Sequence, residues 1–278
     1  MSSRPTIVIT GASDGIGAVA ARALAGPAVD LLVVGRSPEK LAPVAADTGG
    51  VALTADFARL DEVRTLAKEI AGRVDRIDVL INNAGGMFAP RTPTVDGHEP
   101  NFQINHLAPF LLTNLLHDRL AAASGALVLN TSSVANRFGR IDLTDLDYRR
   151  RRALQQFAYG SSKLMNILFA RGIAQRWSAD GIVAAAVHPG PVATSFGRES
   201  RSTGLIYRTP LRRLALISPE SGAAPLIDLA RRGADPSLNG VYFDRHRANG
   251  AENRQAHDQT LIDGLWEIST GLVGLDAR

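Results

Sequence analysis

The chain has 278 residues, 45% of them apolar and 21% charged, and its 31 basic and 27 acidic side chains leave a net charge of +4. This composition excludes a disordered or fibrous protein, and the lack of cysteine excludes disulfides, thiolate metal sites and a cysteine nucleophile. Neither a signal-peptide pattern near Met1–Pro5 nor a run of about 18 apolar residues is present, so we expect a cytoplasmic protein without a membrane span.

Short apolar runs alternate with helix-length segments along the chain. The predicted strands are Thr6–Thr10, Asp30–Gly35, Gly50–Thr54, Ile77–Ile81, Ala126–Thr131, Ile182–Val187 and Val241–Phe243. The predicted helices are Gly15–Ala25, Asp61–Arg73, Pro100–Ala123, Gln155–Trp177 and Pro219–Arg232. Several strands are apolar on both faces, as expected beneath two helical layers. The alternation predicts an α/β fold, a doubly wound (Rossmann), mostly parallel sheet of about seven strands, in a single domain over residues 1–278.

Two segments interrupt this rhythm. Residues 136–152, the arginine-rich segment, end in four consecutive arginines that follow three aspartates, so we expect a solvated loop and no nucleic-acid site. Residues 195–217 mix glycine, serine and arginine with apolar residues such as Leu205, Ile206, Leu211, Leu214 and Leu216. They predict a substrate lid over an apolar pocket, with a permanently packed satellite core or a membrane-surface segment as alternatives.

A glycine-rich turn joins the first predicted strand to the first predicted helix. Glycines in such a turn let backbone N–H groups approach a pyrophosphate at the amino end of the helix, where the dipole favours an anion. The alternative is a plain glycine turn. We predict that the turn binds a dinucleotide through Gly11, Ser13, Asp14, Gly15, Ile16 and Gly17.

The end of the second predicted strand bears on cofactor choice. An acidic residue there would suit the ribose hydroxyl of NAD, whereas arginine can hold the 2′-phosphate of NADP. The sequence places Arg36 and Ser37 at this point, which favours NADP(H) over NAD(H). The alternative is that Arg36 is simply a solvated surface residue.

Further polar groups follow the third and fourth predicted strands, at the edge where open α/β sheets bind ligands. Asp56, next to Phe57, could accept a hydrogen bond from an adenine amino group. Asn83, before Ala84 and Gly85, could tie neighbouring strands together beside the cofactor. Ordinary turn chemistry is the alternative for the asparagine.

Tyr159 and Lys163 stand four residues apart and so share one face of a predicted helix. An ammonium beside a phenol stabilises the phenolate and lowers its pKa, which makes tyrosine a usable general acid and base. Ser133, after the fifth predicted strand, can hydrogen-bond a substrate oxygen. The alternative is an ordinary surface helix, because this spacing is common by itself. Lys163 is one of only three lysines in the chain, which favours a functional pair.

Together these pieces resemble the short-chain dehydrogenase/reductase family. The matching segments occur in family order: residues 10–17, 82–85, Asn105, Ser133, Tyr159 with Lys163, and 188–194. The resemblance implies that Asn105 holds a water in a proton relay and that Lys163 also grips the nicotinamide ribose. It further implies cofactor contacts from Pro189, Gly190, Val192 and Thr194.

The long separation of Ser133 and Tyr159 resembles the retinol-dehydrogenase-like branch of the family, as does the segment Asn105-His106-Leu107. Asp14 departs from the pattern of some NADP-binding relatives, which carry a basic residue at that position.

The predicted function is that of an NADP(H)-dependent oxidoreductase that interconverts a carbonyl and an alcohol on a lipophilic small molecule. The alternative is a non-catalytic dinucleotide sensor or scaffold, which would not need Asn105, Ser133, Tyr159 and Lys163 together. No metal-ligand spacing occurs among the six histidines, so no metal is expected, and a homodimer is left open.

Overall fold

The structure is a computed structural model that describes residues 4–89, 92–152, 154–191 and 217–276. Within these ranges, eight strands form one sheet in the order β3-β2-β1-β4-β5-β6-β7-β8. The strands are β1 (Thr6–Thr10), β2 (Asp30–Gly35), β3 (Val51–Thr54), β4 (Val79–Asn82), β5 (Ala126–Thr131), β6 (Ile182–His188), β7 (Val241–Asp244) and β8 (Arg247–Ala248). Neighbours from β3 to β7 pair in parallel, and β8 pairs antiparallel with β7.

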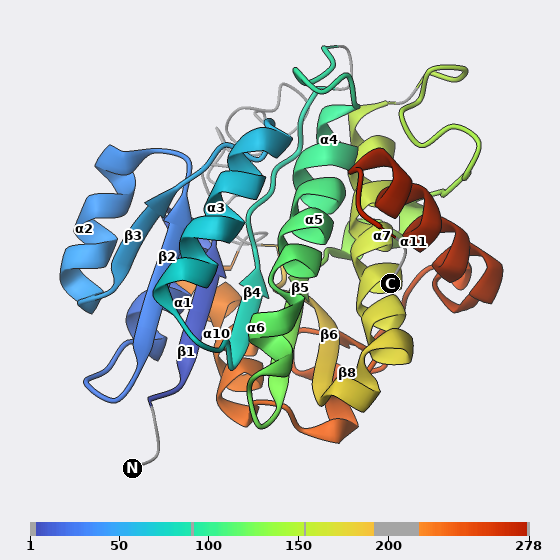
Figure 1. The fold of residues 1–278 in the computed structure, drawn as a ribbon. Coiled ribbons are helices and arrows are strands. Elements are labelled where there is room, and N and C mark those ends of the chain that lie inside the picture. The colour runs from blue at the N-terminus through green and yellow to red at the C-terminus, as the bar shows by residue number, and fades with distance from the viewer. Residues whose placement is uncertain (1–3, 90–91, 153, 192–216, 277–278) are drawn as a thin grey trace.

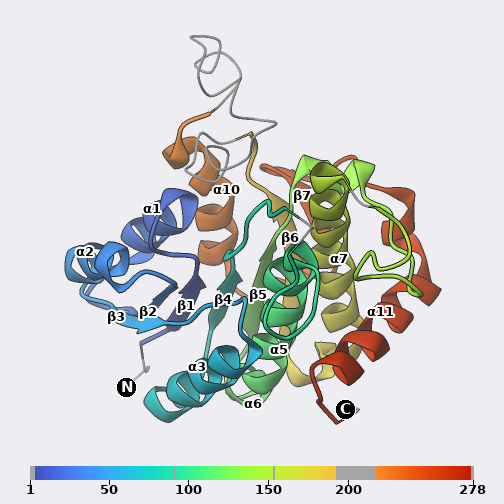
Figure 2. The same ribbon diagram turned by 90° about the horizontal axis from the view of Figure 1, so that it is seen from above.

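Helices cover both faces of this sheet (Figures 1 and 2). The helices are α1 (Gly15–Leu24), α2 (Pro38–Thr48), α3 (Leu60–Arg73), α4 (Pro100–Phe102), α5 (Ala108–Leu115), α6 (His117–Ala121), α7 (Gln155–Arg176), α10 (Pro219–Arg232) and α11 (Gln259–Leu272). One apolar core joins the sheet to α1, α2 and α10, and a second joins it to α3, α5, α7 and α11. The central strands are buried on both faces, which explains their unbroken apolar runs. The predicted doubly wound α/β fold is confirmed.

The segment predicted as one helix over Pro100–Ala123 is largely helical up to Ala121, but it is not one regular α-helix. Its backbone stays helical from α4 through a π-helix over Gln103–Leu107 into α5, and a turn at Leu116 separates α5 from α6. Pro109 has no N–H and cannot donate to the carbonyl of Asn105, the acceptor that an α-helix would require. The wider π turn, with the Ala108 N–H donating to the Gln103 carbonyl, forms at that point.

Two helices were not predicted. α2 begins with Ser37 as its N-cap and Pro38 in its first turn, but it buries only Leu41 and Val44, so its apolar periodicity is weak. α11 lies along α7 on the outside of the molecule (Figure 1). Its apolar face packs into the core that α7 shares with the sheet.

A buried histidine stands in the core between α5, α7 and α11. The His106 ring lies 5.9–6.0 Å from the rings of Phe102, Phe110 and Phe169. Its Nε2 lies 3.0 Å from the Ser269 hydroxyl of α11. Burial lowers the pKa of His106 to about 3, so the ring is neutral near pH 7.

We predict that His106 makes stability fall in acid. Because the pKa of a histidine in the unfolded chain is about 6.5, the unfolded state binds more protons than the folded state between that pH and about 3. Stability is therefore fully present above pH 6.5 and declines as the pH falls, by up to about 1.4 kcal/mol per pH unit. Denaturant unfolding of His106→Phe between pH 7 and pH 4 should show a shallower decline than the parent chain.

The control for this prediction is Phe169→Leu. It disturbs the same aromatic cluster without removing a titrating group, so it should lower stability at every pH and keep the parent slope. An unchanged slope in His106→Phe would contradict the prediction.

Candidate active site

The carboxyl end of β5 is bound to α7 by hydrogen bonds at three side chains. The Ser132 hydroxyl donates to the Lys163 carbonyl at 2.7 Å. The carbonyl of Thr131 accepts from Lys163 Nζ at 3.1 Å and from Asn166 Nδ2 at 3.0 Å. The end of the strand and the middle of the helix therefore form one rigid unit.

Tyr159 and Lys163 lie on the same face of α7, as their spacing predicts. Lys163 Nζ is 5.6 Å from the centroid of the Tyr159 ring. Both side chains are buried, with exposed fractions of 8% for Tyr159 and 4% for Lys163. Burial lowers the pKa of Lys163 to about 8. The lysine makes no ion pair within the described residues, so in its charged form the ammonium acts on the phenol without a counter-ion.

Ser133 lies directly after β5 at the start of a 3₁₀ turn over Val134–Phe138. Its hydroxyl oxygen accepts from the Ala135 N–H at 3.2 Å, which leaves its hydrogen available to a ligand. The turn is pressed against α7 at two glycines. A Cβ on Gly160 would lie 2.6 Å from the Ala135 carbonyl oxygen, and one on Gly139 would lie 2.5 Å from the carbonyl oxygen of Gly160. This contact sets the position of Ser133 relative to α7.

Asn105 is fully buried in the π-helix and faces the loop after β4. Its side chain accepts from the Gly86 N–H at 2.8 Å and donates to the Gly86 carbonyl at 2.8 Å. It also donates to the Ser162 hydroxyl at 2.9 Å. A Cβ on Gly85 would lie 2.5 Å from Asn105 Oδ1 and 3.3 Å from Lys163 Nζ. The structure thus brings Asn105 and Lys163 together beside Gly85.

The glycine-rich turn lies at the carboxyl edge of the sheet, with α1 starting from it. Gly11 has a φ of +66°, and a Cβ on Gly17 would lie 2.1 Å from the Gly11 carbonyl oxygen. Asn83 fastens this turn, because its Nδ2 donates to the carbonyls of Thr10 and Gly11 at 3.1 and 3.3 Å. Its Oδ1 accepts from the Thr131 hydroxyl at 3.3 Å. The strand-tying part of the Asn83 prediction is thus seen in the contacts.

The start of α1 fits an anionic ligand. Asp14 accepts from the Gly15 N–H at 2.7 Å. Within the described residues, the N–H groups of Ile16 and Gly17 make no hydrogen bond, as expected for the first turn of a helix. These donors point from the positive end of a ten-residue helix. The turn therefore meets the requirements of a pyrophosphate site.

Two more predicted cofactor contacts lie at the same edge. Arg36 is exposed after β2, and no ion pair or hydrogen bond holds its guanidinium within the described part of the chain. Ser37 next to it donates to Glu39 at 2.8 Å and caps α2. After β3, Asp56 Oδ1 accepts from the Ala58 N–H at 3.0 Å, so one carboxylate oxygen is already engaged in the turn.

The last predicted contacts follow β6. His188 Nδ1 accepts from the Gly190 N–H at 3.3 Å, and burial lowers the pKa of this histidine to about 4, so it serves the turn. Pro189 and Gly190 reach the same edge of the sheet. The expected contacts Val192 and Thr194 lie outside the described residues. Of the expected lid over residues 195–217, the structure describes only Ile217. Pro191 and Ile217, which flank this segment, are hydrogen bonded at 2.9 Å.

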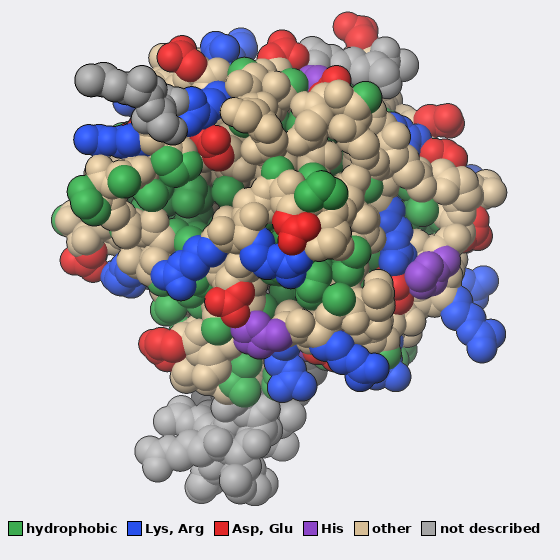
Figure 3. Space-filling model, turned by 90° about the horizontal axis from the view of Figure 1, so that it is seen from below, with side chains coloured by type: hydrophobic (Ala, Val, Ile, Leu, Met, Phe, Trp, Pro, Cys, Tyr) green, Lys and Arg blue, Asp and Glu red, His purple; other side chains and the backbone are tan. Residues whose placement is uncertain are grey.

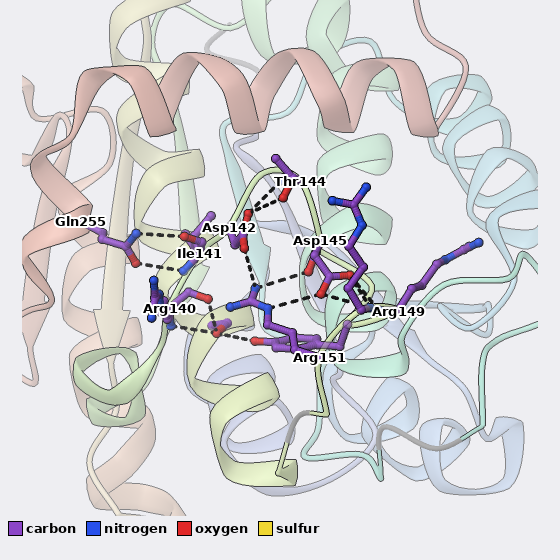
Figure 4. Close-up of polar contacts among 11 residues, drawn as sticks. Arg140, Ile141, Asp142, Thr144, Asp145, Arg149, Arg151 and Gln255 are labelled. Atoms are coloured by element: carbon purple, nitrogen blue, oxygen red, sulfur yellow. Dashed lines mark hydrogen bonds and ion pairs between the residues drawn. The ribbon is translucent and has the colours of Figure 1, made fainter.

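The arginine-rich segment is folded against the amino-terminal part of α7 (Figure 4). Asp145 is buried and accepts from the Arg149 N–H at 2.7 Å and from Arg151 Nε at 3.3 Å. The Tyr148 hydroxyl donates to the Ser161 hydroxyl of α7 at 2.7 Å. The aspartates thus balance part of the arginine charge, as predicted, and the segment has more internal order than a solvated loop.

A hollow lies at the opposite edge of the sheet. Besides apolar residues, its lining contains charged side chains that pair with one another, such as Arg22 with Asp47 at 2.9 Å and Arg4 with Asp30 at 3.8 Å. Figure 3 views the molecule from this side, where basic and acidic side chains are interspersed. Elsewhere in the described ranges, no group of three histidine, aspartate or glutamate side chains could hold a metal. No described helix has the length and apolar character that a membrane crossing requires.

The comparisons with known proteins agree with this geometry. The family model described as short chain dehydrogenase matches residues 5–204. The chain belongs to the short-chain dehydrogenase/reductase family. Members of this family are oxidoreductases that bind a nicotinamide dinucleotide, NAD or NADP, and the chain is therefore an enzyme that interconverts carbonyl and alcohol groups. The alternative of a non-catalytic sensor has no support from this membership.

Individual relatives place the chain in the predicted branch of the short-chain dehydrogenases/reductases. It is 42% identical over 279 residues to a Streptomyces sp. (strain C5) protein named for a daunorubicin C-13 ketoreductase, covering 98% of this chain and 94% of that one. It is 36% identical over 283 residues to retinol dehydrogenase 13 of Homo sapiens, covering 98% and 85%. A solved structure of an uncharacterized Mycobacterium paratuberculosis protein superposes with a TM-score of 0.80 at 32% identity, covering 99% and 96%.

Several residues that shape this site were not found by sequence reasoning. They are Gly139 and Gly160 at the turn contact, Ser132 and Asn166 between β5 and α7, and His106 behind them. The glycine beside Tyr159 was the one visible signal, because a glycine inside a helix is unfavourable unless packing requires it.

We predict that Gly160→Ala reduces activity because the new methyl group must move the turn that carries Ser133. The displacement needed is several tenths of an ångström at least, since the Cβ would lie 2.6 Å from a backbone oxygen. A misplacement of about 1 Å can lower a rate about 100-fold. Steady-state kinetics and thermal unfolding of the purified variant provide the measurement.

Gly72→Ala is the matched control, since nothing lies within 4 Å of its Cβ position near the end of α3. It should keep full activity and gain about 0.5–1 kcal/mol of stability from helix propensity. Parent-like kinetics in Gly160→Ala would show that the contact does not position Ser133.

Proposed function

We propose that this enzyme reduces a carbonyl on a lipophilic small molecule, or oxidises the corresponding alcohol, with Tyr159 as the proton donor and acceptor. The observation that carries the proposal is the juxtaposition of the buried Tyr159 with the buried ammonium of Lys163. When bound, the dinucleotide supplies or takes the hydride at the substrate carbon. The residues of the chain then act on the substrate oxygen.

Tyr159 gives its phenolic proton to the oxygen during reduction and takes it back during oxidation. Lys163 favours the phenolate because its ammonium lies beside the ring and has no counter-ion among the described residues. Ser133 donates its hydroxyl hydrogen to the same oxygen and so orients the substrate. Such proton transfer by a positioned group is worth about 10²–10⁴ in rate.

Asn105 would serve the relay through its backbone, because its side chain is already used by Gly86 and Ser162. The residue four positions further on is Pro109, which cannot donate to the Asn105 carbonyl as a helix residue would. We propose this carbonyl as the acceptor for the water that returns a proton to Lys163.

A lipophilic substrate is supported by the apolar side chains around Ser133 and Tyr159. Val134 and Phe138 on the 3₁₀ turn are 40% and 66% exposed, and Leu154 and Phe157 just before Tyr159 are 60% and 44% exposed. Large apolar groups exposed together on two adjacent segments indicate a binding surface. The ketoreductase and retinol dehydrogenase names of the relatives point to substrates of this kind.

A panel of ketones, aldehydes and alcohols, read by the absorbance of the reduced nicotinamide, tests this function. We expect turnover of members with a large apolar body and a fall of about 10²–10⁴ in kcat/KM for Tyr159→Phe. The variant keeps the ring and loses only the hydroxyl, so it should still bind cofactor by calorimetry. Near-normal turnover by a folded Tyr159→Phe enzyme would overturn the mechanism.

We further propose that the cofactor is NADP(H), held by the glycine-rich turn at its pyrophosphate and by Arg36 at its 2′-phosphate. The guanidinium of Arg36 is exposed beside the cofactor edge and is committed to no described partner. Asp56 would contact the adenine, and Lys163 the nicotinamide ribose. The carboxylate of Asp14 is occupied by the Gly15 N–H, which directs it toward the helix start.

Arg36→Asp should reverse or erase a preference for NADPH over NADH. A charge-assisted contact contributes about 1.5–3 kcal/mol, equal to about a ten- to hundredfold change in Kd. Calorimetric titration of both reduced cofactors gives the two constants. Arg254→Asp, an exposed arginine without an ion pair among the described residues, changes charge equally and should keep the parent preference. Equal binding of the two cofactors by the parent enzyme would count against the assignment.

A further inference from the structure

Three buried polar side chains outside the proposed catalytic set lie along a path from α11 to the Thr131 carbonyl, which receives Lys163 Nζ. Ser269 of α11, His106 of the π-helix and Asn166 of α7 are exposed by 0%, 1% and 4%. The Ser269 hydroxyl meets His106 Nε2 at 3.0 Å. Asn166 Nδ2 donates at 3.0 Å to the carbonyl that also receives Lys163 Nζ.

The middle link of the path follows from what each atom can do. The Thr131 carbonyl can only accept, so the amide nitrogen of Asn166 faces it and Oδ1 is left for another partner. His106 Nδ1 and Asn166 Oδ1 are two buried polar atoms with no hydrogen-bond partner in the described residues. The Asn166 side chain raises the pKa of His106 against the larger lowering by burial, as an acceptor near the ring does. With its hydrogen on Nδ1, His106 would donate toward Asn166 Oδ1 and accept from Ser269 at Nε2.

We propose that His106, Asn166 and Ser269 are positioning residues for Lys163. Asn166 occupies one lone pair of the Thr131 carbonyl, so Lys163 Nζ is confined to the other. His106 holds Asn166 in the orientation that presents its amide nitrogen to that carbonyl, and Ser269 holds the His106 ring. In this way α11, at the far end of the chain, fixes the direction of the ammonium beside Tyr159.

This inference rests on the proposed role of Lys163, and it adds residues that touch neither substrate nor cofactor. None of the three side chains is charged near pH 7, because burial keeps His106 in its neutral form. A neutral path orients the ammonium without offering it a counter-ion, which a carboxylate in the same place would do. The ammonium thus stays available to the phenol of Tyr159.

The test uses Asn166→Leu, which keeps the volume of the side chain and removes both hydrogen bonds. We expect kcat/KM to fall about 10- to 100-fold, because a displaced ammonium no longer lies correctly beside the ring. In the alcohol-oxidation direction, the kinetic pKa for the active phenolate should move up toward the ordinary value of about 10. A residue that only stabilised the fold would leave that pKa in place.

His106→Phe and the double variant test whether the residues act as one path. His106→Phe suits the surrounding aromatic rings and should show a smaller loss of kcat/KM in the same direction. The double variant should lose no more than Asn166→Leu alone, whereas independent effects would multiply. If Asn166→Leu does not fold, Ser269→Ala takes its place. This small change at the α11 end of the path should lower kcat/KM and raise the kinetic pKa in the same direction.

Asn114→Leu is the matched control. Asn114 is also a buried helical asparagine, and its Nδ2 donates to the Phe110 carbonyl at 2.9 Å, away from Lys163. It should lower Tm while kcat/KM and the kinetic pKa stay at parent values. The proposal is overturned if Asn166→Leu, or Ser269→Ala in its place, behaves like Asn114→Leu. Activity in Tyr159→Phe would instead refute the proposed function, so the two failures are distinguishable.

Discussion

The buried ammonium of Lys163 is the constraint on which the site depends. Desolvation disfavours the charged form of a lysine, and within the described residues the structure compensates it with a single backbone carbonyl, that of Thr131. A carboxylate would stabilise the charge better, but it would also cancel the field that acts on Tyr159. The fold therefore accepts a lysine whose pKa burial lowers to about 8, and the surrounding elements are arranged to keep the ammonium and the phenol in place.

That arrangement explains why so many polar groups join β5 to α7. Ser132, Lys163 and Asn166 connect the strand to the helix, and the close contact of Gly139 with Gly160 presses the following turn against the same helix. Rigid support of this kind matters because hydrogen transfer tolerates little displacement of the groups involved. The arginine-rich segment and α11 add cover from outside, through the Tyr148 contact with α7 and through Ser269.

Sequence reasoning found the residues whose chemistry is local and missed those whose role comes from packing. The pair Tyr159 and Lys163 could be predicted because helical spacing alone puts them on one face, and the α/β alternation predicted the sheet because parallel strands are apolar on both sides. The π-helical stretch around Asn105 was not predicted, because the apolar run hides the effect of Pro109 on the hydrogen bonds of the helix. α2 was not predicted because its two buried residues give only a weak apolar periodicity. The proposed role of His106 could not be predicted because it depends on α11, which is more than 150 residues away in sequence.

Thr131 connects the two halves of the site. Its hydroxyl donates to Asn83, which fastens the glycine-rich turn where we propose that the dinucleotide binds. Its carbonyl receives Lys163 Nζ and Asn166 Nδ2 on the side of the proposed proton chemistry. Because hydride and proton must reach adjacent atoms of one substrate, the cofactor side and the tyrosine side have to keep a fixed separation. A single residue that hydrogen-bonds to both sides, through its side chain to one and its backbone to the other, holds that separation without relying on a flexible linker.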